Sequence, residues 1–110
     1  MKEYRNTTIK DWSVEDRPRE KMLQYGVQSL SNAELLAILL GSGTRDMNAV
    51  DVARNMLSSV KNNLHDLAKL RLNELTSFRG IGPARAITIM AAMELSSRRA
   101  GAQLPERVSI

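Results

Sequence analysis

Cysteine is absent from the sequence, which excludes disulfide bonds and thiolate metal sites. Aromatic residues make up only 4% of the chain, so aliphatic side chains and six methionines must build the core. The β-branched residues do not alternate over any long stretch, and a sheet is therefore not expected. We predict an all-α fold.

Long hydrophobic runs are also lacking. The longest nearly apolar stretches, residues 35–40 and 86–93, are far shorter than the about 20 residues that span a bilayer. Near the N-terminus, Lys2, Glu3 and Arg5 are followed by no apolar run, so no secretory signal is visible. We expect a soluble, cytoplasmic protein with no membrane partner.

Groups that carry out catalysis are scarce as well. The only histidine, His65, is not surrounded by a constellation of Glu, His and Asp residues, and no nucleophile–base pair or P-loop is recognisable. We therefore expect no catalytic residue, no metal site and no cofactor in this chain. The net charge of +4 is mildly basic, which suits a phosphate-bearing partner without requiring one.

The pattern along the chain predicts a compact bundle of five or six short helices. A flexible arm (1–16) precedes the helical domain (17–100), and a linker (101–110) follows it. Ser31 and Glu34 form a capping box ahead of a helix that is apolar nearly all round, so we expect that helix to be central and buried. The expected helices cover residues 19–25, 35–40, about 47–60, 64–69, 72–77 and 83–99.

The most informative stretch runs from Phe78 to Ala86, where two glycines flank Ile81 and Pro83 opens the last helix. Pro suits the first helical position, and glycine can adopt positive φ or let a ligand approach the main chain. A helix N-terminus is a favourable place for an anion. We predict a phosphate-binding turn made of Arg79, Gly80, Ile81, Gly82, Ala84 and Arg85.

A looser copy of this pattern occurs earlier, at Gly41, Ser42, Gly43 and Thr44, between two predicted helices. The residues 45–48 that follow make it looser than the later copy. Whether it is a degenerate first hairpin that packs against the second stays open, and the later copy itself could be a plain corner between helices.

The stretch 80–86 resembles a helix-hairpin-helix motif, an element that binds DNA without sequence preference. Together with the segments 16–23 and 30–40, it makes residues 16–100 resemble the N-terminal region of the RadC family, proteins named for DNA repair. The resemblance implies that full-length members carry a C-terminal JAB/MPN-type metallopeptidase-like domain with a zinc motif. That motif is not in this sequence, so zinc is expected only in the absent domain.

We therefore expect a non-enzymatic module that grips the phosphate backbone of double-stranded or branched DNA. The alternative is a protein-interaction or dimerisation scaffold that positions the C-terminal metallopeptidase-like domain, in which self-association would bury the hairpin.

Overall fold

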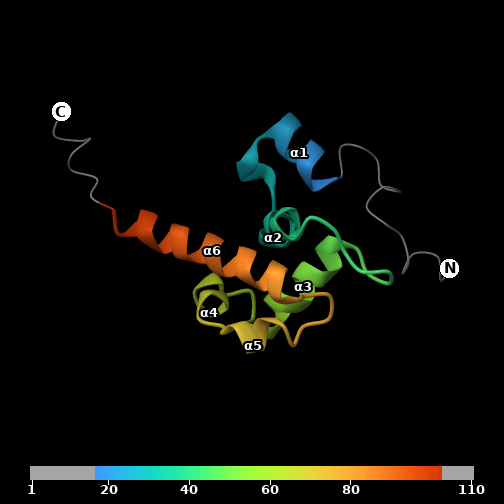
Figure 1. The fold of residues 1–110 in the computed structure, drawn as a ribbon. Coiled ribbons are helices and arrows are strands. Elements are labelled where there is room, and N and C mark those ends of the chain that lie inside the picture. The colour runs from blue at the N-terminus through green and yellow to red at the C-terminus, as the bar shows by residue number, and fades with distance from the viewer. Residues whose placement is uncertain (1–16, 103–110) are drawn as a thin grey trace.

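The computed structural model describes residues 17–102, and over that range it contains only helices and connecting loops (Figure 1). The prediction of an all-α fold is confirmed. The predicted arm (1–16) and most of the predicted linker (101–110) lie outside the described residues. The helices are α1 (Pro18–Tyr25), the 3-10 helix η4 (Val27–Ser29), α2 (Asn32–Leu40), α3 (Ala49–Ser59), α4 (Leu64–Ala68), α5 (Leu72–Leu75) and α6 (Pro83–Ala100).

Local sequence signals set where the helices begin. Pro18 and Pro83 lie in the first turns of α1 and α6, where a missing N–H costs no helical hydrogen bond. The predicted capping box is present, since the Glu34 N–H donates to the Ser31 hydroxyl at 3.2 Å. In return the Ser31 N–H donates to the Glu34 carboxylate at 2.8 Å.

Several helix boundaries differ from the prediction by one to three residues, and two of these differences have a visible local cause. Helix α3 begins later, because Asn48 caps it by accepting a hydrogen bond from the Asp51 N–H at 2.8 Å. Helix α5 ends earlier, at Leu75, and the Ser77 hydroxyl beyond it donates to the Glu74 carbonyl at 2.6 Å. Such local bonds from serine offer the backbone an alternative to the next helical turn.

The core is centred on α3, and this corrects one expectation. Helix α2 is central, as predicted, in that it packs against α1, α3 and α6. It is not the most buried helix, however, because Leu39 is exposed and only Leu36, Ala37 and Leu40 are fully buried. The apolar stripe of α3 lies wholly inside and comprises Ala49, Val50, Val52, Ala53, Met56 and Leu57.

Helix α6 runs across the whole fold in Figure 1, with α4 and α5 on one side and α1 and α2 on the other. Its C-terminal half extends past the other helices, and Leu95 there is 68% exposed. Within residues 17–102, no helix combines the length and the apolarity needed to cross a bilayer.

One ion pair ties α1 to α2. Lys21 Nζ lies 3.2 Å from the Glu34 carboxylate, which also accepts the N–H of Ser31. Burial alone would raise the pKa of Glu34, but the hydrogen bonds from Ser31 and Lys21 outweigh it, and the pKa lies below the ordinary value of 4.5.

Because that folded-state pKa is depressed, the contribution of Glu34 to stability is complete above pH 4.5 and disappears as the pH falls through the folded-state value. Glu34→Gln keeps a capping side chain but loses the charge. We expect the wild type to exceed this variant in melting temperature at pH 7, and the difference to shrink in acid below pH 4.5. Thermal melts followed by circular dichroism measure this, with Glu94→Gln as the control at an exposed ion pair.

Two isoleucines give a matched test of the core. Ile81 is 4% exposed and Ile87 is 57% exposed, although both lie near the start of α6. Ile81→Ala should lower the free energy of unfolding by about 2–5 kcal/mol because it leaves a cavity. Ile87→Ala should change it by no more than about 0.5 kcal/mol, as is usual for surface positions. Denaturant unfolding of both variants measures the difference, and equal losses would contradict the assigned burial.

Candidate functional site

Two glycine-containing loops, distant in sequence, lie against each other. The first glycine loop (41–48) joins α2 to α3, and the second glycine loop (76–82) joins α5 to α6. From α6, Arg85 donates through Nη1 to the Gly80 carbonyl at 2.8 Å and through Nη2 to the Ser42 hydroxyl at 2.7 Å. Arg79 and Asp46 form an ion pair between the same two loops. The two predicted groups of site residues are thus brought together.

Gly80 is where the two loops meet most closely. Its φ of 89° lies in the left-handed region that favours glycine. A Cβ at this position would lie 2.7 Å from Cγ2 of Thr44, so the side chain must be absent for the loops to touch. The next residue, Ile81, points into the core, and its N–H donates to the Phe78 carbonyl at 3.1 Å.

Gly82 differs from Gly80 in that no contact within the described chain requires a glycine there. Its φ is −90° with ψ of −178°, which any residue adopts, and a Cβ would meet nothing within 4 Å. The residue is exposed, as are Pro83 and Ala84 after it. The outward side of the second glycine loop is therefore open, and its backbone can be approached closely from solvent.

The N-terminus of α6 carries backbone N–H donors that meet no acceptor in the described part of the chain. Among the described residues, the N–H groups of Gly82, Ala84 and Arg85 donate to no backbone carbonyl, and the first helical bond is from Ala86 to Gly82. The N-cap, Gly82, has no side chain that could accept them. These donors, together with the positive end of the helix dipole, form a surface that can bind an anion.

The other α-helices of the described range have an acidic residue in the first turn, which offsets the positive end of the helix dipole at the N-terminus. These residues are Glu20, Glu34, Asp51, Asp66 and Glu74 in α1 to α5. Helix α6 has none there and carries Arg85 instead. The charge near its N-terminus is therefore positive both from the helix dipole and from the side chains.

The first glycine loop is a tight turn built on its own backbone. Thr44 accepts through Oγ1 from the N–H groups of Asp46 and Met47, at 3.2 and 3.0 Å, and its N–H donates to the Met47 carbonyl at 2.7 Å. A Cβ on Gly43 would lie 2.0 Å from that same carbonyl. Gly41, with φ of 83°, ends α2. These hydrogen bonds all lie within the first glycine loop itself.

The two arginines differ in how much they are engaged. Arg85 is half-buried and joins both loops, whereas Arg79 extends into solvent and pairs only with Asp46 among the described residues. Asp46 was not among the predicted site residues. Its partner, Arg79, is 33 positions away, which no local pattern could reveal.

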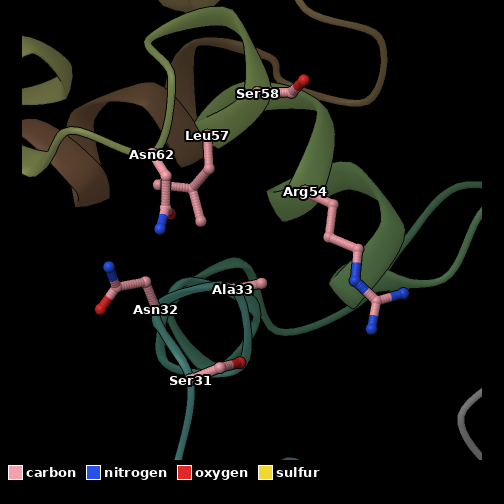
Figure 2. A pocket seen from close by; sticks show the side chains of 7 residues that line it. All are labelled: Ser31, Asn32, Ala33, Arg54, Leu57, Ser58 and Asn62. Atoms are coloured by element: carbon pink, nitrogen blue, oxygen red, sulfur yellow. The ribbon is translucent and has the colours of Figure 1, made fainter.

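A separate cleft of about 430 Å³ opens between the start of α2 and the end of α3 (Figure 2). The side chains of Asn32 and Asn62 face each other across it, and Arg54 lies at one side. These groups can form hydrogen bonds, but the lining residues include no histidine or carboxylate that could act as a base. Within residues 17–102, no three acidic or histidine side chains gather in a way that could hold a metal ion.

Residues 9–87 match the family model described as UPF0758 N-terminal. The chain is 52% identical over 104 residues to a UPF0758 protein of Porphyromonas gingivalis, covering 94% of this chain and 46% of the relative. It is 50% identical over 91 residues to a UPF0758 protein of Flavobacterium johnsoniae, covering 83% of this chain and 39% of the relative. A UPF0758 protein of Moorella thermoacetica is 52% identical over 101 residues, covering 92% of this chain and 44% of the relative.

No solved structure matches the chain. The chain spans less than half the length of these curated relatives. The family model covers more than half of its residues, from within the predicted arm (1–16) to the first turn of α6. The chain therefore belongs to the UPF0758 family and contains that family's N-terminal region.

Proposed function

We propose that this domain binds DNA without sequence preference by gripping the phosphate backbone at the second glycine loop. The observation that carries the proposal is the exposed N-terminus of α6, which lacks both a capping side chain and an acidic first-turn residue. The free N–H groups of Gly82, Ala84 and Arg85 would donate to phosphate oxygens. Such contacts follow the backbone and not the bases.

Gly82 supports the same proposal from a different direction. Neither its backbone angles nor its neighbours in the described chain require a glycine. A glycine in such a place is explained if something outside the chain must come close to the main chain. A phosphate seated on the helix N-terminus has that requirement, and Arg79 and Arg85 would supply charge beside it.

The resemblance of residues 16–100 to the N-terminal region of the RadC family supports the proposal at the level of sequence. On this view the second glycine loop, with α5 and α6, is a helix-hairpin-helix motif, and the first glycine loop is a degenerate partner packed against it. The module has no reaction of its own. It would bring DNA to a C-terminal metallopeptidase-like domain, and zinc would belong to that domain alone.

The second candidate function is a scaffold that positions such a domain or joins two copies of the chain. The observation that favours it is a row of exposed apolar residues along α6, comprising Ile87, Ala91 and Leu95. Residues four apart share one face of a helix, so these three form a stripe. An exposed apolar stripe on a helix is suited to packing against another protein surface.

The first test is fluorescence anisotropy of the 110-residue chain with a DNA duplex at low and moderate salt. Binding should weaken as salt rises, because phosphate contacts release counterions.

Gly82→Asp places a carboxylate at the N-cap, where it competes with phosphate for the same donors. We expect a loss of about tenfold or more in affinity, since a charge-assisted hydrogen bond contributes roughly 1.5–3 kcal/mol. Replacing both Arg79 and Arg85 by alanine should also remove most of the binding.

Gly82→Asp is informative because stability and binding should move in opposite directions. An aspartate N-cap stabilises a helix, so the melting temperature should stay level or rise while DNA affinity falls. Ser97→Asp adds the same charge near the far end of α6 and should leave most of the affinity intact. Absence of binding by the folded wild type at low salt, or an equal loss in both variants, would refute the proposal.

The scaffold function makes its own prediction. If α6 joins two copies, sedimentation should show a dimer of the wild type, and Leu95→Asp should convert it to a folded monomer. The variant should stay folded because Leu95 is exposed in the single chain and makes little contribution to its core. A monomeric wild type would remove self-association from consideration.

A further inference from the structure

The ion pair between Arg79 and Asp46 contributes little to holding the two glycine loops together. The side chains are 64% and 55% exposed, respectively, and exposed pairs of this kind add little to stability. The loops are held by other contacts, namely the packing of Gly80 on Thr44 and the two hydrogen bonds of Arg85. Asp46 can therefore release Arg79 without separating the loops.

The backbone of Asp46 is held by a contact other than its ion pair with Arg79. Its N–H donates to the Thr44 hydroxyl at 3.2 Å, within the turn of the first glycine loop. The carboxylate therefore extends from a hydrogen-bonded turn, whereas its own contact is with Arg79. A guanidinium binds a carboxylate and a phosphate with the same planar fork of donors, so the two anions compete for one partner.

We infer that Asp46 is an internal competitor at the DNA site: its carboxylate holds Arg79 in the free domain and is exchanged for a backbone phosphate on binding. This inference rests on the proposed DNA-binding function. Because of this exchange, an anion binds Arg79 only if it can displace the Asp46 carboxylate. A dense row of phosphates can displace the carboxylate because counterions are released along the whole strand, whereas an isolated anion has no such gain.

The experiment compares the duplex affinities of two single-charge variants by fluorescence anisotropy at one fixed salt concentration. Asp46→Asn removes the competitor, and Glu94→Gln removes an acid of an exposed ion pair with Arg98 on the distant part of α6. Both raise the net charge by one unit, so any general electrostatic gain is shared. We expect Asp46→Asn to bind more tightly than Glu94→Gln by about two- to fivefold, the range of an exposed ion pair. Asp46→Ala should give the same gain.

The same comparison in an Arg79→Ala background tests whether the gain in DNA affinity of Asp46→Asn depends on the ion pair. In that background Asp46→Asn should bind no more tightly than Glu94→Gln, because no guanidinium remains to be released. A gain that persists would reflect local repulsion of DNA by Asp46 and would overturn the exchange, as would equal affinities of Asp46→Asn and Glu94→Gln. In both cases the wild type still binds DNA, so the proposed function survives. If no variant binds at low salt, both the exchange and the proposed function are wrong.

Discussion

The close approach of Gly80 to Thr44 is the constraint on which the functional region depends. Any side chain at Gly80 would collide with the first glycine loop, and the positive φ there turns the backbone so that Ile81 enters the core. With Ile81 fixed inside, Gly82 and the start of α6 must face outward. One missing Cβ and one buried side chain therefore determine which backbone groups meet solvent.

The helix N-termini differ in whether their backbone donors are satisfied within the chain or left open to a ligand. At several helix N-termini, acidic first-turn residues and capping side chains accept hydrogen bonds from the backbone N–H groups and offset the positive end of the helix dipole. Ser31 and Glu34 do this for α2. Helix α6 is the longest helix of the described range, yet its N-terminus has neither. A capping side chain there would contribute about 1 kcal/mol. Its absence keeps the donors available to an external anion, which is consistent with the proposed function.

Much of the fold follows from local sequence, because its signals act over one helical turn. The capping box at Ser31 and the prolines at the starts of α1 and α6 are of this kind. The relative burial of α2 and α3 is not, because the number of apolar residues in a helix does not tell how much of its surface the neighbouring helices cover. Here Leu39 of α2 stays exposed, while the apolar stripe of α3 is covered throughout.

The candidate site likewise has features that local sequence predicts and contacts that it does not. Its glycines and arginines stand out in the sequence because turn chemistry and charge are local properties. The contacts of Arg85 with Ser42 and of Arg79 with Asp46 join positions 43 and 33 residues apart, so only the packed helices can reveal them. These contacts add to the predicted role of the two arginines. Arg85 also connects the two loops by hydrogen bonds, and Arg79 is already paired with Asp46 in the absence of a ligand.

The length of α6 has a geometric consequence. Its 18 residues make a rod of about 27 Å, rigid on the scale of the domain, with the glycine loops at one end. Whatever the chain carries beyond Gly101 begins at that fixed separation. Because each residue of an α-helix rotates the chain by about 100° around the helix axis, adding or deleting a single residue near Leu95 would turn the C-terminal end of α6 to another side of the axis while leaving the loops untouched. The length of α6 thus sets how far from the glycine loops, and facing which side, the helix ends.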